Sequence, residues 1–398
     1  MLKLAHKLSG DRLLACGLMS GTSMDGVDAA LVELNADADD VRPVLLAFTT
    51  VTYSDEQRDL LMDLAVGQQC TAEDIATLNT AVAVAFANAF FTVCRESDIK
   101  PAEVLFIGSH GQTVAHVPPG DAERPIAGTL QLGSPGMIAA LTGVTTVGDF
   151  RVGDMALGGQ GAPLVPYVDY LIRRSDTVSR IILNLGGIAN ITYLPKGGKR
   201  EDTLAFDTGP GNMVLDSLYR ALFPGAGLYD MEGSRAAQGR VSEELAGEFL
   251  RHPYFSRKPP KSAGHGEFGV RFAWKFLERA RQAGCSANDT LATAAMVTAV
   301  SVASAIDRYV TPAGGVDEIL VSGGGVHNRH LVETIADAVK PVRVEAVDVL
   351  GIPANAKEAV DFAILARETL FERTNVLESA TGASRAAILG TIALGSFS

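Results

Sequence analysis

The stretch that decides the fold is Gly17-Leu18-Met19-Ser20-Gly21-Thr22-Ser23-Met24-Asp25-Gly26-Val27-Asp28. An apolar run at 13–18 precedes it and another at 29–33 follows it, so the pattern predicts two strands joined as a hairpin. Backbone amides of such a turn, with the hydroxyls of Ser20, Thr22 and Ser23, suit phosphate oxygens. Asp25 would be repelled by phosphate, and its carboxylate suits a water on Mg²⁺ instead. Taken alone, the segment fits an ordinary polar hairpin equally well.

Two further glycine-rich turns follow predicted strands. Gly186 and Gly187 join strands expected at 181–183 and 188–193, and would close over phosphates, although a plain tight turn is the simpler reading of this segment alone. The second turn, Gly323-Gly324-Gly325, follows a strand expected at 318–321 and would let an adenosine lie against a helix start. Glycine-rich strand ends are common, so this turn too is weak by itself.

The two familiar phosphate-loop motifs are absent from the sequence. A Walker A loop requires GxxxxGK[ST], but Gly198-Lys199 is followed by Arg200. The dinucleotide pattern GxGxxG fails at both candidate positions, where Asn328 and Val214 stand in the last place. The remaining phosphate candidates are therefore hairpin turns with small hydroxyl residues and an acid.

Strand hairpins followed by alternating strands and helices occur twice, which predicts two similar α/β domains facing a cleft. Helices are expected at 71–96, 290–310, 358–367 and 382–394, and a strand at 104–107 runs into Gly108-Ser109-His110-Gly111. We expect an N-terminal domain formed by 1–155 plus 380–398 and a second domain formed by 156–379.

Composition limits the class of protein. The net charge of −12 would repel a nucleic-acid backbone, whereas 47% hydrophobic residues can form a sizeable core. The four cysteines form no CxxC pair, which favours a reducing compartment. No signal peptide and no apolar run of about 20 residues is recognised, so we expect a cytoplasmic protein with no membrane or nucleic-acid partner.

The three turns together resemble the actin, sugar-kinase and heat-shock-chaperone ATPase superfamily, and more closely the anhydro-N-acetylmuramic acid kinase family. The matching segments follow the family order over nearly the whole chain. They are GLMSGTSMDGVDAAL at 17–31, IGSHGQT at 107–113, GDFR at 148–151, GGQGAPLVP at 158–166, LNLGGIANIT at 183–192, FDTGPGN at 206–212, PPKS at 259–262, SGGGVHN at 322–328 and NAKEAVDFA at 355–363. The resemblance implies two actin-like, ribonuclease H-like domains around a nucleotide, with ATP and Mg²⁺ as cofactors and a homodimer as the assembly.

The family reaction implies an unusual base. Its substrate, 1,6-anhydro-N-acetylmuramic acid, has no free 6-hydroxyl, so a base must activate water to attack the anomeric carbon and free the 6-oxygen for phosphorylation. We expect Asp207 to be this base, because it ends a strand in the turn of Gly209, Pro210 and Gly211 and lies in the family's DTGPGN motif. The alternative is an aspartate that caps the following helix.

Substrate contacts are expected from Asp149, Arg151 and Glu358. In extended chain Asp149 and Arg151 would point to the same side, and Arg151 could bind the lactyl carboxylate or other sugar oxygens. A surface Asp–Arg pair is the alternative. Glu358 could bond the sugar or order the attacking water, or could be an exposed acid at a helix start. His110 and His327 are interpreted as structural.

The resemblance is imperfect after PPKS, where the family continues with Thr-Gly-Arg-Glu and this chain has Ala263-Gly264-His265-Gly266-Glu267. Two other functions remain open from the sequence. One is an ordinary hexosamine kinase that phosphorylates a free hydroxyl. The other is an actin-like or chaperone-like ATPase that uses nucleotide to switch domain angle and bind partners. A metal-dependent hydrolase has poor support, because HExxH and clustered histidines are absent from the sequence.

Overall fold

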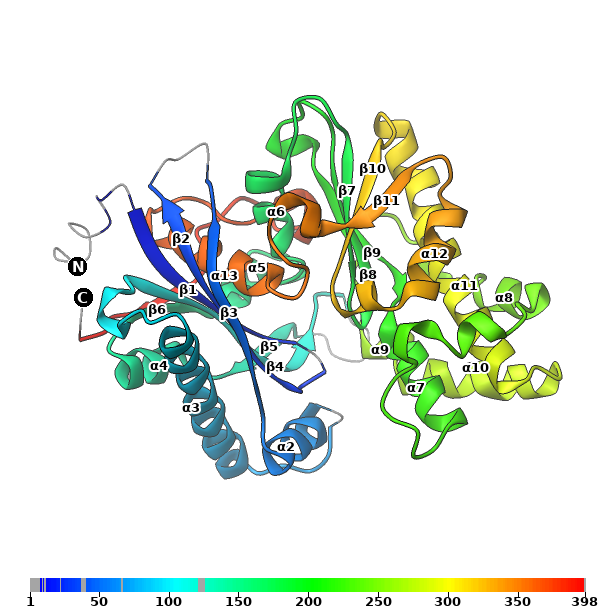
Figure 1. The fold of residues 1–398 in the computed structure, drawn as a ribbon, viewed down its shortest axis with the longest axis horizontal. Coiled ribbons are helices and arrows are strands. Elements are labelled where there is room, and N and C mark those ends of the chain that lie inside the picture. The colour runs from blue at the N-terminus through cyan, green and yellow to red at the C-terminus, as the bar shows by residue number, and fades with distance from the viewer. Residues whose placement is uncertain are drawn as a thin grey trace. The chain divides into compact units, whose positions relative to one another are not determined.

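The computed structural model describes residues 8, 10, 12–21, 23–36, 41–65, 67–120 and 126–396 (Figure 1). The chain folds into two compact units, one formed by 1–172 with 356–398 and the other by 173–355. These borders differ from the expected ones. Segments 156–172 and 356–379 belong to the first unit because Lys357 binds Asp169 at 3.0 Å and helix α13 (Lys357–Leu370) packs on that unit's sheet.

The first unit contains a sheet with the order β12-β6-β4-β1-β2-β3, and β5 pairs with β4. Strands β1 and β2 form the expected antiparallel hairpin, with Leu18 opposite Ala29. The strands are β1 (Arg12–Ser20), β2 (Gly26–Asn35), β3 (Val44–Thr52), β4 (Phe106–Val117), β5 (Gly128–Leu132), β6 (Thr145–Gly148) and β12 (Thr391–Ala393). The helices are α2 (Asp55–Ala65), α3 (Ala72–Glu96), α4 (Pro135–Thr142), α5 (Phe150–Ala156), α6 (Val165–Arg173, ending in the second unit), α13 and α14 (Glu378–Thr381).

The second unit repeats this plan in a sheet with the order β11-β10-β7-β8-β9. Strand β7 pairs antiparallel with β8 and parallel with β10, as β1 pairs with β2 and β4. The strands are β7 (Arg180–Leu185), β8 (Ile188–Leu194), β9 (Leu204–Pro210), β10 (Glu318–Ser322) and β11 (Arg343–Ala346). The helices are α7 (Asn212–Leu222), α8 (Glu243–Phe249), α9 (His265–Phe268), α10 (Val270–Gln282), α11 (Ala287–Ala305) and α12 (Arg329–Ala338). The prediction of two similar α/β domains is therefore confirmed for these shared pairings, whereas β5 and β12 of the first sheet have no counterpart in the second.

Helices α3 and α13 cover opposite faces of the first sheet. Cys16 and Leu18 of β1 belong to the apolar core beneath α3, whereas Gly17 between them faces α13. A Cβ on Gly17 would lie 2.6 Å from the carbonyl carbon of Ala359, and one on Gly108 would lie 2.7 Å from that of Phe362. The two glycines therefore let the backbone of α13 lie directly on the sheet.

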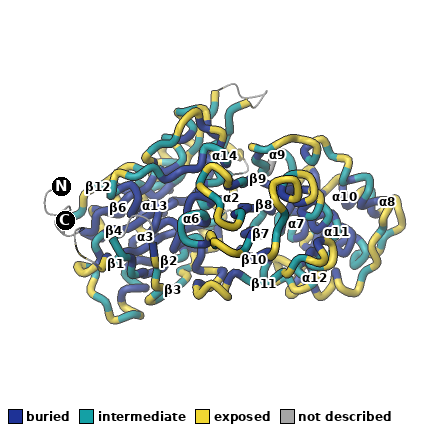
Figure 2. Tube along the Cα trace, turned by 90° about the horizontal axis from the view of Figure 1, so that it is seen from above, coloured by how far each residue is buried: buried dark blue, intermediate teal, exposed yellow. Residues whose placement is uncertain are grey.

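Helix α3 begins as the sequence predicts. The Thr71 hydroxyl accepts a hydrogen bond from the Asp74 amide, and the Asp74 carboxylate accepts one from the Thr71 amide, which completes a capping box. Helix α3 and the segment Ala287–Ala313 are long and apolar enough to cross a membrane by length and composition, but 50% and 72% of their most apolar stretches are buried inside the structure. Figure 2 shows α11 mostly buried, as a core helix is, whereas α8 carries exposed residues.

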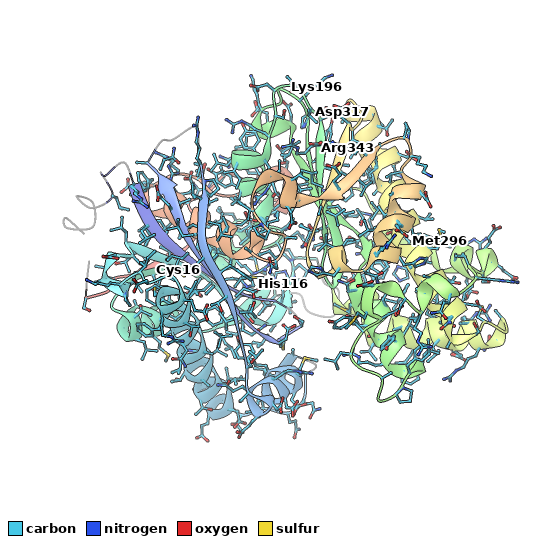
Figure 3. All side chains as sticks on the ribbon, in the orientation of Figure 1. Cys16, His116, Lys196, Met296, Asp317 and Arg343 are labelled. Atoms are coloured by element: carbon cyan, nitrogen blue, oxygen red, sulfur yellow. The ribbon has the colours of Figure 1, made fainter. Side chains whose placement is uncertain are left out.

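Three local predictions are wrong. Strand β4 does not end at Ile107 but continues through Gly108-Ser109-His110-Gly111, because that segment pairs with β1 and then with β5. The helix expected at 382–394 does not form, and residues 391–393 of that range are strand β12, which pairs antiparallel with β6. Asp149 is not extended. It has a left-handed φ of 56°, which ends β6 and turns the chain into α5. The four cysteines, including Cys16 in the first sheet (Figure 3), are all free thiols.

Candidate functional site

The turn of the first hairpin is held together by buried polar side chains. The Ser20 hydroxyl lies 2.6 Å from both the Gly26 carbonyl and Oε1 of Gln112, and accepts a hydrogen bond from the Tyr53 hydroxyl at 3.2 Å. Nε2 of Gln112 donates to the Gly21 carbonyl at 3.1 Å. The Ser20 hydroxyl therefore fixes the turn rather than pointing outward. Sequence reasoning missed the supporting Gln112 and Tyr53, although Gln112 stands in the quoted IGSHGQT segment.

The remaining described residues of this turn differ in how far they are buried. Met24 is buried with a φ of 54°, and Gly26 and Val27 are buried in the start of β2. Ser23 and Asp25 are exposed, and the Ser23 hydroxyl donates to Oδ1 of Asp25 at 2.6 Å. Thr22 lies outside the described residues. The exposed part of the turn thus offers one carboxylate next to one hydroxyl.

Asp28 follows on β2 and is half-buried. Its Oδ1 accepts a hydrogen bond from the Thr50 hydroxyl at 2.6 Å. Burial raises the pKa of Asp28, which the Thr50 hydrogen bond lowers in part and the charge of Asp25 raises further. Asp25 is therefore close enough for its charge to act on Asp28.

The guanidinium of Arg151 is held by backbone and by a histidine. Its Nε and Nη2 lie 3.3 Å and 2.8 Å from Nε2 of His110, and its Nη1 donates to the Gly161 carbonyl at 3.0 Å. The His110 ring packs on the Phe362 ring of α13 at 4.8 Å between centroids. Burial and the facing cation lower the pKa of His110 to about 3, so the neutral ring accepts from Arg151 through Nε2. His110 has the structural role that was expected, as a support for Arg151.

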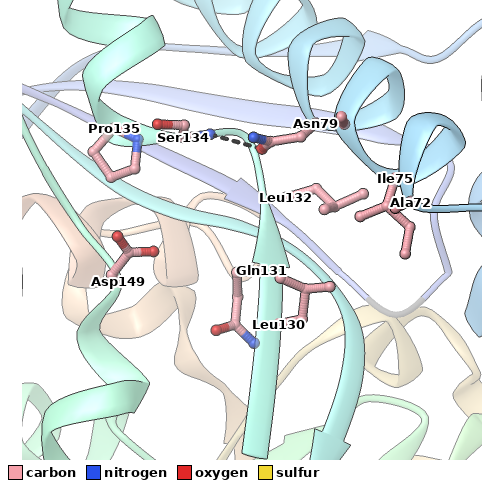
Figure 4. Close-up of a pocket in the computed structure, with 10 residues that line it drawn as sticks. Ala72, Ile75, Asn79, Leu130, Gln131, Leu132, Ser134, Pro135 and Asp149 are labelled. Atoms are coloured by element: carbon pink, nitrogen blue, oxygen red, sulfur yellow. Dashed lines mark hydrogen bonds between the residues drawn. The ribbon is translucent and has the colours of Figure 1, made fainter.

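Asp149 does not share these surroundings. Its side chain lines a cavity of about 260 Å³ between α3, β5 and the start of α5 (Figure 4). Asn79 lies on the other side of that cavity, where its Oδ1 accepts hydrogen bonds from the amides of Gly133 and Ser134. Burial raises the pKa of Asp149. The prediction that Asp149 and Arg151 point to the same side of an extended chain is wrong, because the left-handed Asp149 separates a strand from a helix.

Glu358 lies at the N-terminus of α13 and is half-buried, not an exposed helix-start acid. Burial is the main effect that raises its pKa. Lys357 and Arg151 lower that pKa, and Asp361 and Asp28 raise it. Glu358, Asp28 and Arg151 therefore lie near enough to interact electrostatically. The first unit brings together three residues that are far apart in the sequence.

Asp207 is fixed by main-chain contacts on β9 in the second unit. It is 8% exposed. Its amide donates to the Lys261 carbonyl at 3.1 Å, and its Oδ2 accepts a hydrogen bond from the Ala263 amide at 2.6 Å. The Tyr254 hydroxyl donates to the Asp207 carbonyl at 2.8 Å. The helix-cap alternative is wrong, because the N-cap residue of α7 is Gly211.

The glycine turns of the second unit converge on one another. The amide of Gly211 donates to the Gly187 carbonyl at 3.0 Å, and that of Asn212 to the Gly186 carbonyl at 2.8 Å. Nδ2 of Asn212 donates to the Leu185 carbonyl at 3.0 Å. The turn between β7 and β8 is therefore bonded directly to the DTGPGN segment that carries Asp207.

The third turn packs against the same place. Gly323 has a φ of 78°, and Gly324 and Gly325 begin a 3₁₀ helix (Gly324–His327). A Cβ on Gly323 would lie 2.9 Å from the Leu185 carbonyl carbon, and one on Gly325 would lie 2.5 Å from Cβ of Leu185. Only glycine lets this turn approach the β7 end so closely. All three sequence motifs of the second unit thus meet at one edge of its sheet.

No group of three or more His, Cys, Asp or Glu side chains that could hold a metal ion occurs among the described residues. Mg²⁺ usually takes one or two carboxylates together with substrate phosphates, rather than an all-protein cage. The exposed carboxylate of Asp25, beside the Ser23 hydroxyl, fits this need for hard oxygen ligands.

Comparisons with known proteins match this chain to one family over almost its full length. A family model described as anhydro-N-acetylmuramic acid kinase matches residues 13–395. A protein of that name from Caldanaerobacter subterraneus subsp. tengcongensis is 40% identical over 383 residues, which are 96% of this chain and 97% of that protein. One from Salinibacter ruber is 42% identical over 385 residues, covering 96% of each.

Among solved structures, the activator of the 2-hydroxyisocaproyl-CoA dehydratase from Clostridium difficile with bound ADPNP has a TM-score of 0.45 and 13% identity, and the match covers 90% of this chain and 96% of that one.

Proposed function

We infer the function of this chain from its family, since it belongs to the anhydro-N-acetylmuramic acid kinase family by a model match over residues 13–395 and by relatives at 40% and 42% identity. We propose that it is an ATP-dependent kinase that opens 1,6-anhydro-N-acetylmuramic acid with water and phosphorylates the 6-oxygen. The observation that carries this proposal within the structure is the carboxylate of Asp207, which the Ala263 amide holds on β9, while Gly211 and Asn212 just after β9 bond the Gly186-Gly187 turn.

The proposed reaction opens the anhydro bridge with water and phosphorylates the oxygen that it frees. Asp207 takes a proton from water, and the water oxygen bonds to the anomeric carbon while the bond from that carbon to the 6-oxygen breaks. The freed 6-oxygen takes the γ-phosphoryl group of ATP, so that the products are N-acetylmuramic acid 6-phosphate and ADP. A positioned general base contributes about 10²–10⁴-fold in rate. The hydrogen bond from the Ala263 amide to Oδ2 supports this role, because it restrains the carboxylate from rotating away.

We assign substrate contacts to Arg151, Glu358 and Asp149. The planar guanidinium of Arg151, kept in place by His110 and the Gly161 carbonyl, suits a carboxylate such as the lactyl group of the sugar. The raised pKa of Glu358 suits a group that bonds a sugar hydroxyl or orders water. Asp149, in its own cavity, would contact a different part of the sugar from Arg151.

ATP is assigned to the turns of both units. The backbone of Gly21 to Asp28 and of Gly186-Gly187 would bind phosphates, and Gly323-Gly324-Gly325 would lie against the adenosine. Asp25 would hold Mg²⁺ through water, and this ion when bound neutralises charge on the transferred phosphoryl group. We further propose a cytoplasmic homodimer without nucleic-acid or membrane partners, which rests on the family resemblance and the net charge of −12.

The test is an incubation with ATP, Mg²⁺ and the anhydro sugar in ¹⁸O-labelled water, with the product masses recorded. We expect one labelled oxygen at the anomeric position of a phosphorylated sugar. A phosphorylated sugar without label would support an ordinary hexosamine kinase instead. An unchanged sugar beside slow ADP release would support a nucleotide switch.

The base is tested by Asp207→Asn, with Asp176→Asn at an exposed position of the same unit as the matched control. We expect turnover to fall by at least about 10²-fold in the first variant and to stay unchanged in the second. Near-normal turnover in Asp207→Asn, with ATP binding intact, would refute the assignment.

A further inference from the structure

A lysine in the PPKS segment lies buried beside Asp207. Lys261 is 7% exposed, and its Nζ lies 4.5 Å from the centre of the Tyr254 ring and 5.7 Å from that of Phe206. Burial lowers the pKa of Lys261 to about 8, while the charge of Asp207 raises it in part. A cation in such surroundings is costly, so its place next to a carboxylate needs a reason.

The same short segment holds Asp207 through its main chain. The Lys261 carbonyl accepts the hydrogen bond of the Asp207 amide, and the Ala263 amide donates to the Asp207 carboxylate. Tyr254, whose ring lies against the Lys261 ammonium, donates its hydroxyl to the Asp207 carbonyl. Lys261 and Tyr254 therefore each form a hydrogen bond with the main chain of Asp207. The Lys261 ammonium also lies against the Tyr254 ring.

We propose that Lys261 is a positioning residue for Asp207, whose ammonium stabilises the ionised carboxylate that the backbone of residues 261–263 holds in place. The inference rests on the proposed function, because it assigns Lys261 a role in the state of the proposed base. A positive charge near a carboxylate favours its charged form, and only the charged form can accept a proton from water.

Two further cations, Arg257 and Arg308, lie near this cluster. Arg257 and Arg308 lower the pKa of Lys261, which means that they repel its ammonium. Burial is the main effect that raises the pKa of the Tyr254 hydroxyl, and the charges of Asp207 and Glu267 raise it further. Glu267 binds Arg257 at 3.1 Å. Among these groups Lys261 is the cation set between the two rings next to Asp207.

The first test is the pH profile of kcat/KM for Lys261→Met, Lys261→Arg and the control Lys258→Met, which removes an exposed lysine three residues away. In Lys261→Met the acid limb is expected to move to higher pH by about one pH unit, because the carboxylate loses a stabilising charge. Lys261→Arg keeps the positive charge, so its acid limb is expected to lie close to the pH of the unaltered chain. An acid limb at the same pH in all variants overturns the inference.

The second test needs no turnover and covers the case in which Lys261→Met fails to fold. Protein labelled with ¹³C at lysine Cε is titrated by NMR, and the Lys261 resonance is identified by its loss in Lys261→Arg. We expect this lysine to titrate near pH 8 in the unaltered chain and lower, by about one pH unit, in Asp207→Asn. An unchanged titration in Asp207→Asn overturns the inference and leaves the proposed function standing. Undiminished turnover in Asp207→Asn refutes the base itself.

Discussion

Replacing Gly108 with alanine tests the close packing of α13 on the first sheet. The added Cβ would lie 2.7 Å from the carbonyl carbon of Phe362 and 2.9 Å from Cβ of Ala366. Ordinary contacts begin near 3.4 Å, so the helix would have to move by roughly 1 Å, and no side-chain rotation relieves the overlap. Overpacking of this kind costs about 3 kcal/mol.

The measurement is hydrogen–deuterium exchange of peptides from β1 and β4. Fluorescence would report the other unit, because the one tryptophan of the sequence is Trp274. A loss of about 3 kcal/mol speeds exchange through unfolding of the first unit by about 100-fold. Peptides from β7 and β10 serve as an internal reference.

The matched control is Gly136→Ala in helix α4. There the nearest atom to an added Cβ is Oγ of Ser134 at 3.7 Å, so we expect no loss of protection. The reasoning is refuted if β1 and β4 exchange at the same rate in Gly108→Ala as in Gly136→Ala.

Three further changes test the first unit. Thr71→Ala removes the capping box of α3 and is expected to cost about 1 kcal/mol in thermal unfolding; an unchanged midpoint would contradict this. Lys357→Met leaves the carboxylates of Asp169 and Asp361 buried without their cation, at a cost of about 3–5 kcal/mol; exchange of α13 amides at the normal rate would contradict it. His110 has a pKa of about 3 when folded, below its unfolded value of about 6.5, so the unfolded chain binds the extra proton and stability falls as the pH drops from 6.5 toward 3. At pH 5 the free energy of unfolding is expected to be about 2 kcal/mol lower than at neutral pH, and His110→Gln is expected to remove this dependence. The measurement is exchange of β4 amides, corrected for intrinsic rates. A profile as steep as that of the unaltered chain would contradict the prediction.

Local signals predicted the parts of the fold that depend on a few neighbouring residues. The hairpins at 13–33 and 181–193 follow from apolar runs on either side of a polar turn, and both form. The start of α3 follows from the Thr71 and Asp74 pair alone. The repeated strand order could be expected because the same pattern occurs twice in the chain.

The parts of the fold that the sequence did not predict depend on contacts between residues far apart in the chain. Gly17 stands in a segment that suggests a phosphate turn, but its own place is under α13, more than 300 residues later in the chain. Asp149 was expected in extended chain, and its left-handed conformation is uncommon even for aspartate, so the local sequence alone did not predict it.

The same limit applies to the candidate site. The motif DTGPGN located Asp207, but the burial of Lys261 depends on the rings of Phe206 and Tyr254, which come from separate segments. An exposed Glu358 and a buried one were equally consistent with a helix start. Its surroundings are set by Asp28 and Arg151, which the sequence places far away.

The division of the chain into units has a consequence for synthesis. The second unit is one continuous segment, 173–355, whereas the first is completed only by 356–398. A growing chain that ends near residue 355 holds the whole second unit but lacks α13 and β12, so the apolar face around Gly17 and Gly108 has no cover. We therefore expect the segment made later to fold earlier. A truncated chain that ends at residue 355 and is released from the ribosome is expected to resist protease over 173–355 while the first 172 residues are cleaved.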